Sequence, residues 1–417
     1  MLLDKGEPQA LAWMPSLGWT SLLRLLHIVP TYLPAVRYGG PIRSVHALCR
    51  GLAAAGHDVH VFTTSVDGDG DSDVPLGTPV DLEGVKVTYF PSHHLRRLYW
   101  SPPMGRALSS AVPTFDLVHL HAIYLWPMWA AARLARRGHI PYVSSPRGML
   151  VPELIRRRSA WIKRAWLALI ERRNLERAAA IHATSTVEAD HLAAFGWSLP
   201  RVWVIPHGVD DPEPTEGLTV TADVAAAIAS GPYVLSLGRI NWEKGLDRLI
   251  AALPLSPAAR VVIAGDDREN HAAFLSDLAR RANVGDRVTI IARHVDGADK
   301  DALFAGAELF AMTSLSENFG LASFEAMRRG RPVLVTREVG MSEIVREANA
   351  GVVVDGTADA IAAGLNMLLG DPEERHRMGE AGRARVVARY GWPAVAGQME
   401  ALYRSVLGRN VPKGGSR

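Results

Sequence analysis

The sequence has a single cysteine, Cys49, among its 417 residues, so it cannot form an intrachain disulfide, which is typical of a reducing compartment. It lacks any run of the roughly 18–20 uninterrupted apolar residues that a membrane-spanning helix needs. The N-terminus holds acids and prolines but no basic stretch, which argues against a secretory signal peptide. We therefore expect a cytoplasmic protein, with residues 1–21 as an N-terminal extension.

An excess of one charge is missing too, because 46 Lys and Arg residues oppose 43 Asp and Glu residues and leave a net charge of +3. So small a surplus gives no reason to expect nucleic acid as a partner. The sequence also shows no repeat with a period of 20–50 residues, which argues against a solenoid.

Short apolar, β-branched runs alternate with longer helical patterns along the whole chain. Most of these runs are continuously apolar, as expected for strands covered by helices on both faces. The expected strands are LLRLLHIVP, HDVHVFTT, VKVTYFP, FDLVHLH, PYVSSP, AIHATS, VWVIPHG, YVLSLGR, RVVIAG, RVTIIA, LFAMTS, PVLVT and GVVVD. The alternation predicts an α/β fold with doubly wound parallel sheets, and the number of strands favours two domains.

The predicted domain break is the segment Asp210–Pro232, which is rich in proline, glycine and acids and has no strand pattern. We therefore expect an N-terminal domain over residues 22–208 and a C-terminal domain over 209–390. Residues 391–417 should form a helix that packs back on the N-terminal domain. Ligands of such sheets bind beyond the carboxyl ends of the strands, so the loops after strands should carry the chemistry.

A glycine pair, Gly39 and Gly40, follows the first expected strand and precedes a helix that has Pro41 in its first turn. Glycines there let the backbone approach a ligand, and a helix N-terminus favours an anion. A loop without a ligand explains the pair equally well. The pair is not part of a G-x-G-x-x-G fingerprint, so a nicotinamide dinucleotide is not favoured.

Two cations follow the strand YVLSLGR, with Arg239 at the strand end and Lys244 near the start of the next helix. Cations that converge with free backbone amides on a helix N-terminus can hold a pyrophosphate. The alternative is that both are solvated surface charges. Their place at the carboxyl end of a strand favours the binding role.

The segment LSENFGLASFEAM places Glu317 in a loop after the strand LFAMTS, and Glu325 on the helix that follows. The two glutamates are either solvated acids at a helix start or ligands of a substrate. In the second case Glu325 could accept hydrogen bonds from a ribose diol, and Glu317 from the hydroxyls of a second ring. A glycosidase would need two carboxylates about 5–10 Å apart across one bond, and would leave the cation pair without a use.

These segments, together with YGGPIRSVHALCRGLAAAGHDV and VIPHGVD, resemble the retaining glycosyltransferases of family 4, over nearly the whole chain from about Leu22. The resemblance implies the GT-B fold, in which two Rossmann-like domains face each other across a cleft. It implies transfer of a sugar from a nucleotide-sugar donor to a glycan or lipid-linked acceptor, with retention and without a required metal or other cofactor. The branch that makes exopolysaccharides is the most similar one.

The resemblance also implies roles for single residues. Arg239 and Lys244 would hold the donor diphosphate, Glu325 the ribose and Glu317 the transferred sugar. The other implied donor contacts use backbone or small residues: Gly39, Gly40, Phe319, Gly320 and Leu321.

One position departs from the family pattern, because Arg147 precedes Gly148 in SPRGML where many members have a histidine that contacts the donor sugar. Arginine is a permanent cation and cannot act as a base. Two other histidines, His119 and His121, end the preceding strand, and we expect His121 to reach the cleft while the other serves the core. Whether Arg147 or His121 replaces the usual histidine stays open.

Two further segments carry charge. DGDGDSD (Asp67–Asp73) resembles a calcium loop but lacks the glycine and the closing glutamate of an EF-hand, so we expect a solvated, flexible loop. Ile155–Ala178 holds eight Lys and Arg residues against two glutamates, with tryptophans at helical spacing. Such a helix could lie on anionic lipid at the inner membrane face, or could be a solvated basic face whose tryptophans pack on the core.

Two other function classes remain as alternatives. Glu317 could act in a hydrolase or phosphorylase that cleaves glycans, or the chain could bind a nucleotide sugar without catalysis. The cation pair argues against the first, and the intact pair of glutamates beside it argues against the second.

Overall fold

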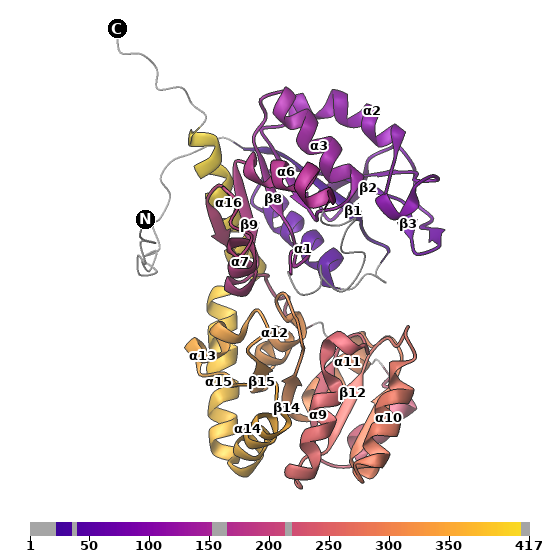
Figure 1. Cartoon of the computed structure of the whole chain (residues 1–417), viewed down its shortest axis with the longest axis vertical. Helices are drawn as coiled ribbons and strands as arrows, with labels where there is room; N and C mark the ends of the chain where they lie inside the picture. The colour runs from indigo at the N-terminus through magenta and orange to yellow at the C-terminus, as the bar shows by residue number, and fades with distance from the viewer. Residues whose placement is uncertain (1–21, 36–39, 152–164, 213–218, 410–417) are drawn as a thin grey trace.

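The structure is a computed structural model that describes residues 22–35, 40–151, 165–212 and 219–409. Two α/β domains lie one above the other in Figure 1, each built on its own sheet. This confirms the predicted GT-B architecture of two Rossmann-like domains. Among the described residues, every helix is too short or too polar to cross a membrane.

The N-terminal sheet has the strand order β10-β9-β8-β7-β1-β2-β6-β5, and all neighbours are parallel except β5 and β6. Each expected strand of the first half is present. The strands are β1 (Arg24–Thr31), β2 (Asp58–Thr64), β5 (Val80–Leu82), β6 (Val85–Phe90), β7 (Leu117–His121), β8 (Tyr142–Ser145), β9 (Ala180–Ala183) and β10 (Val202–Val204). The helices of this half are α1 (Gly40–Ala54), α2 (Pro102–Ala111), α3 (Trp126–Arg137), α6 (Arg172–Glu176) and α7 (Thr186–Ala193), with a π-helix at Leu167–Glu171.

The C-terminal sheet is fully parallel, with the order β13-β12-β11-β14-β15-β16. Its strands are β11 (Tyr233–Leu237), β12 (Val261–Ala264), β13 (Val288–Ile291), β14 (Ala307–Met312), β15 (Val333–Thr336) and β16 (Gly351–Val354). The helices are α8 (Ala222–Ala229), α9 (Leu246–Ala252), α10 (His271–Arg281), α11 (Gly297–Gly306), α12 (Leu321–Arg328), α13 (Ser342–Ala348), α14 (Ala358–Gly370) and α15 (Pro372–Arg389).

The continuously apolar strands are buried on both faces, as their composition predicts. β12 and β15 are buried at every position, and their side chains divide between two apolar clusters on opposite sides of the sheet. The same division holds for β1 in the N-terminal domain. Helices on both faces supply the rest of each cluster, which leaves the strand ends as the accessible parts of the sheets.

The chain crosses between the domains at two adjacent places. The amide of Val209 donates to the carbonyl of Tyr390 at 2.9 Å, and Val209 and Gly391 form a β-bridge. Helix α16 (Trp392–Arg409) then packs on α1 of the N-terminal domain, where a Cβ at Gly51 would lie 3.1 Å from Ala396 Cβ. Figure 1 shows α16 beside the upper domain, while α15 lies on the lower one.

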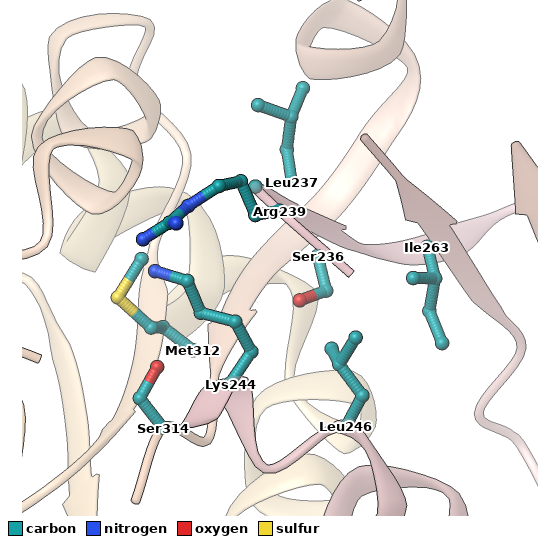
Figure 2. Close-up of a pocket in the computed structure, with 9 residues that line it drawn as sticks. Ser236, Leu237, Arg239, Lys244, Leu246, Ile263, Met312 and Ser314 are labelled. Carbon is teal, nitrogen blue, oxygen red and sulfur yellow. The ribbon is translucent and has the colours of Figure 1, made fainter. Parts of the chain in front are cut away.

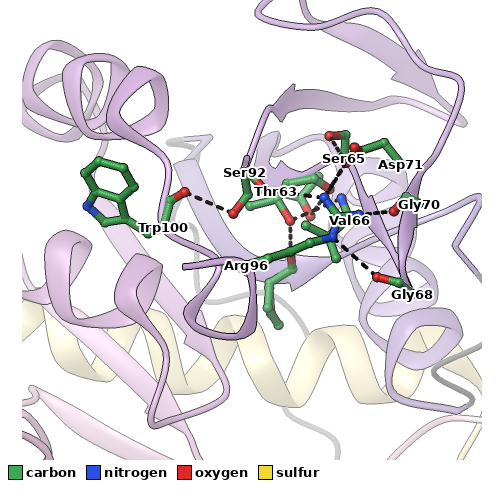
Figure 3. A network of polar contacts seen from close by, with 11 residues as sticks. Thr63, Ser65, Val66, Gly68, Gly70, Asp71, Ser92, Arg96 and Trp100 are labelled. Carbon is green, nitrogen blue, oxygen red and sulfur yellow. Dashed lines mark hydrogen bonds and ion pairs between the residues drawn. The ribbon is translucent and has the colours of Figure 1, made fainter. Parts of the chain in front are cut away.

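The acidic segment Asp67–Asp73 forms a small antiparallel hairpin of β3 (Val66–Asp67) and β4 (Gly70–Asp71). The guanidinium of Arg96 lies against this hairpin, donating to the carbonyl oxygens of Gly68 and Gly70 and pairing with Asp71 at 3.2 Å (Figure 3). An arginine therefore takes the position of the cation that the acidic composition suggested. The segment is exposed at β4, as expected for a solvated loop, but it contains a short paired hairpin that was not predicted.

Candidate active site

The turn after β11 places two cations at the mouth of a pocket. Arg239 follows Gly238, and Lys244 ends a short helical turn just before Gly245. Gly245 has φ +58°, and a Cβ there would lie 2.1 Å from the carbonyl oxygen of Thr313, so the turn is pressed against the end of β14. Figure 2 shows the side chains of Arg239 and Lys244 directed toward the same side of the pocket, near Met312 and Ser314.

Backbone hydrogen bonds tie this turn to the loop after β14. The amide of Leu315 donates to the carbonyl of Glu243 at 2.8 Å, and the hydroxyl of Thr313 donates to the carbonyl of Gly245 at 2.9 Å. The side chains meet as well, because the amine of Lys244 forms an ion pair with Glu317. Both side chains are only about a fifth exposed, at 21% and 19%. The structure thus brings together residues 73 positions apart that the sequence linked only by pattern.

Backbone hydrogen bonds hold the loop around Glu317 against the segment that follows β15. The amide of Glu317 donates to the carbonyl of Glu338 at 3.2 Å, and the amide of Gly340 donates to the carbonyl of Glu317 at 2.9 Å. The ring of Phe319 is buried, and Gly320 has φ +104° at the start of α12. The loop therefore has a fixed path, in which Phe319 serves the core and the turn at Gly320 aims α12.

Glu325 lies on α12 and has a different partner from Glu317. The amine of Lys300, on α11, donates to Glu325 at 3.1 Å. Each glutamate is therefore the counter-ion of its own lysine, so the two do not form an acid and base pair. Lys300 was not among the predicted residues, because nothing in the composition of α11 distinguishes it from a surface lysine.

On the N-terminal side, Arg147 and His121 form one hydrogen-bonded chain. Arg147 donates to Nδ1 of His121 at 2.8 Å, so that nitrogen must be an unprotonated acceptor. Nε2 of His121 then donates to Nδ1 of His27, also at 2.8 Å. Arg147 also lies 3.4 Å from Nδ1 of His207, whose ring stands edge-on to Phe319 at a centroid distance of 5.0 Å. The chain runs from the cleft into the core of the N-terminal domain.

A second chain of hydrogen bonds runs beside the first. Nε2 of His182 donates to the carbonyl of Ile205 at 2.9 Å, so its Nδ1 must accept from the hydroxyl of Ser145 at 2.7 Å. Ser145 then accepts from Nε2 of His119, and Nδ1 of His119 accepts from the hydroxyl of Tyr403 on α16. His119 is thus a satisfied core histidine, and it fastens α16 to the sheet.

Burial keeps these imidazoles neutral. The pKa of His27 and of His182 is lowered to about 3, with burial as the larger cause and the nearby charge of Arg147 as the second. The pKa values of His119, His121 and His207 lie well below the usual value, with burial as the largest cause and with neighbouring histidines and Arg147 adding to it. Burial also lowers the pKa of Arg147, to about 10, which still leaves a cation at neutral pH.

Three of these histidines, His27, His119 and His121, have ligand nitrogens within 4.8 Å of one another, which is the spacing of a metal site. Their hydrogen bonds argue for a different role. A proton lies between Nδ1 of His27 and Nε2 of His121, where a metal would need both lone pairs. The guanidinium of Arg147 would also repel a cation. We interpret the group as a neutral, hydrogen-bonded core.

Two predicted elements lie partly outside the residues that the structure describes. Gly39 lies outside the described residues, as do residues 155–164 of the basic segment Ile155–Ala178. Gly40 is the first residue of α1, and a Cβ there would lie 2.8 Å from Cδ1 of Leu321, so α1 meets the start of α12 across the cleft. In the remaining basic segment, Leu169 is 77% exposed, and Arg172 and Arg173 are exposed beside it.

Two sequence profiles of known families match the chain. The profile of glycosyl transferases group 1 matches residues 224–385, and that of the glycosyl transferase 4-like domain matches residues 39–208. The first profile covers most of the C-terminal domain, and the second covers most of the N-terminal domain. This is the family that the motifs of both domains predicted.

Curated relatives align over almost their full length. A glycogen synthase from Mycobacterium tuberculosis is 28% identical, over 91% of this chain and 94% of that protein. A GDP-mannose:cellobiosyl-diphosphopolyprenol alpha-mannosyltransferase from Komagataeibacter xylinus is also 28% identical, over 94% of this chain and 95% of that protein.

Solved structures share the fold. A sucrose-phosphate synthase from Thermosynechococcus elongatus has a TM-score of 0.70 at 24% identity, covering 93% of this chain and 100% of that one. The structure of HepE from Anabaena in complex with UDP and glucose has a TM-score of 0.71 at 19% identity, covering 92% of this chain and 100% of that one.

Proposed function

Because the chain belongs to the group 1 glycosyltransferases and has the GT-B fold, we propose that it moves a sugar from a nucleotide-sugar donor to an acceptor. The transfer retains the anomeric configuration, and the acceptor is a glycan or lipid-linked saccharide of cell-surface polysaccharide synthesis. The observation that carries the proposal is the meeting of Arg239, Lys244 and Glu317 at the carboxyl ends of β11 and β14.

In this proposal the ion pair between Lys244 and Glu317 belongs to the state without substrate. When the donor enters, its diphosphate takes the amine of Lys244 from Glu317, and Arg239 supplies the second cation. Glu317 is then free to accept hydrogen bonds from the hydroxyls of the transferred sugar. Glu317 loses its ion pair in this exchange, and the hydroxyls of the sugar supply hydrogen bonds in place of the amine of Lys244.

Bond cleavage leaves an additional negative charge on the terminal phosphate of the departing nucleoside diphosphate. Preorganised cations next to the developing charge are the largest stabilising contribution that such a site can offer. The proposal therefore assigns the leaving group to Arg239 and Lys244 and requires no metal ion. Glu325 accepts from the ribose, and the backbone of Phe319, Gly320 and Leu321 lines the donor.

The N-terminal domain closes the site from the other side. Gly40 approaches the donor at the start of α1. Arg147, which is held by its hydrogen bond to His121, faces the transferred sugar. A relative that acts on a diphosphopolyprenol-linked acceptor supports a lipid-linked acceptor here. The exposed Leu169 with Arg172 and Arg173 supports contact with an anionic membrane, at the inner face of a cytoplasmic location.

The test is to incubate the protein with a panel of nucleotide sugars and to measure released nucleoside diphosphate, with and without diphosphopolyprenol-linked saccharides. We expect one uridine or guanosine diphosphate sugar to be consumed and its diphosphate to raise the melting temperature. Proton NMR of the product should show the anomeric configuration of the donor. Neither consumption nor stabilisation with any nucleotide would overturn the proposal.

A further inference from the structure

The residue between Glu317 and Phe319 reaches across the cleft into the N-terminal domain. The side-chain amide of Asn318 donates to the hydroxyl of Thr184 at 2.7 Å, and its backbone carbonyl accepts from the hydroxyl of Ser185 at 2.8 Å. Thr184 and Ser185 follow β9, more than 130 residues earlier in the chain. The loop that carries Glu317 is therefore held by both domains.

Glu188 organises the surface that receives Asn318. Its buried carboxylate accepts from the amide of Gly148 at 2.6 Å, and from the amide and the hydroxyl of Thr184 at 2.7 and 2.9 Å. A hydroxyl has one proton, so Thr184 gives it to Glu188 and must accept from Asn318. The amide of Glu188 in turn donates to Ser185, which leaves the proton of Ser185 for the carbonyl of Asn318. The donor and the acceptor of each of these hydrogen bonds are therefore fixed.

Two glycines make room for Asn318 on either side. A Cβ at Gly148, which has φ +74°, would lie 2.6 Å from Cβ of Asn318. A Cβ at Gly340 would lie 2.0 Å from the carbonyl oxygen of Asn318. The socket, which we define as Gly148, Thr184, Ser185 and Glu188, thus fits this residue with no space for a methyl group.

We propose that Asn318 is a positioning residue, whose docking in the socket fixes Glu317 against the donor sugar when the domains close. The role deepens the proposed transfer and rests on it. Asn318 has no part in the bond changes, and acts through the backbone of its neighbours Glu317 and Phe319. Because docking needs the closed cleft, the arrangement of Glu317 is completed only when the N-terminal domain is in place.

The kinetic test compares Asn318→Ala, Thr184→Val and the double variant. Each single change removes the hydrogen bond between Asn318 and Thr184, and Thr184→Val also removes the one from Thr184 to Glu188. Each should therefore lower kcat by roughly tenfold or more while donor KM changes by less than threefold. The double variant should be no slower than the slower single one. Thr186→Val is the matched control, because Thr186 lies two positions after Thr184, at the start of α7, and its side chain is exposed. Unchanged kcat in Asn318→Ala, or multiplied losses in the double variant, would overturn the proposal.

A second measurement does not depend on activity. Hydrogen exchange of the amides over residues 315–321 should be at least tenfold faster in Asn318→Ala and in Thr184→Val than in the parent, and unchanged in Thr186→Val. Equal exchange in all four proteins would show that the socket does not hold the loop. If the parent consumes no nucleotide sugar, the transfer proposal fails, while this comparison still decides whether Asn318 docks.

Discussion

The two domains place polar side chains at equivalent positions, the carboxyl ends of parallel strands, and use them in opposite ways. In the C-terminal domain Lys244 and Glu317, which lie in the segments after β11 and β14, are partly exposed and pair as full charges. In the N-terminal domain the histidines at the ends of β7 and β9 are buried, neutral and hydrogen-bonded in chains. A strand end thus predicts where polar chemistry lies, whereas burial decides whether it meets substrate or supports the fold.

The largest effect should come from the charged side of this comparison. Lys244→Ala removes one of the two cations assigned to the leaving group, so we expect kcat to fall by about a hundredfold or more. The melting temperature should change little, because Glu317 is partly solvated. Steady-state release of nucleoside diphosphate measures this, with Lys86→Ala, an exposed lysine of the N-terminal domain, as control. A loss of stability without a loss of kcat would reverse the assignment.

Removing one hydroxyl from the buried histidine chains of the N-terminal domain should lower stability. Tyr403→Phe leaves the buried Nδ1 of His119 without its donor, which should lower the free energy of unfolding by up to about 3 kcal/mol. Tyr124→Phe is the matched control, because the buried hydroxyl of Tyr124 has no hydrogen-bond partner among the described residues. Urea unfolding should separate the two variants, and equal stability would show that the His119 chain contributes nothing.

The buried imidazoles also predict a pH dependence. The pKa of His27 is about 3 in the fold and about 6.5 when unfolded, so below pH 6.5 the unfolded chain binds the extra proton. Stability from this group is therefore fully present above pH 6.5 and falls as the pH drops toward 3. At pH 5 the loss is about 2 kcal/mol. His27→Phe should reduce the fall in urea midpoint between pH 7.5 and pH 5, and an unchanged fall would contradict the assignment.

The smallest effect concerns the second glutamate. Glu325→Ala should raise donor KM by about tenfold with little change in kcat, because a ribose contact is equally strong in the ground state and the transition state. Lys300 then loses its partner but stays partly solvated. Glu373→Ala, an exposed glutamate in the first turn of α15, is the control. A fall in kcat with unchanged KM would instead place Glu325 at the reacting bond.

Much of the fold was predictable because its strands are continuously apolar. β12 and β15 could be predicted without knowing which strands they pair with, because a continuously apolar run is expected to be buried on both faces. By contrast, β3 and β5 were missed, because strands of two or three residues are too short to show such a pattern. Their pairing depends on Arg96 and on the neighbouring strand β6.

The candidate site divides in the same way. Glu317 and Lys244 were selected from motifs within single loops, and their ion pair with each other was not predicted. The pairing of Asn318 with Thr184 was not predictable, because it joins loops of different domains and depends on how the domains meet. The link from Arg147 to His121 was also missed, since its direction follows from a hydrogen-bond chain that continues to His27.

The paired crossings at Val209 and Gly391 restrict how the two domains can move. A single linker would act as a swivel with three rotational degrees of freedom. Two crossings joined by a hydrogen bond leave mainly one rotation, about an axis through both. The domains should therefore open and close by a hinge rotation about this axis. Asn318 should then meet Thr184 in the same geometry at each closure.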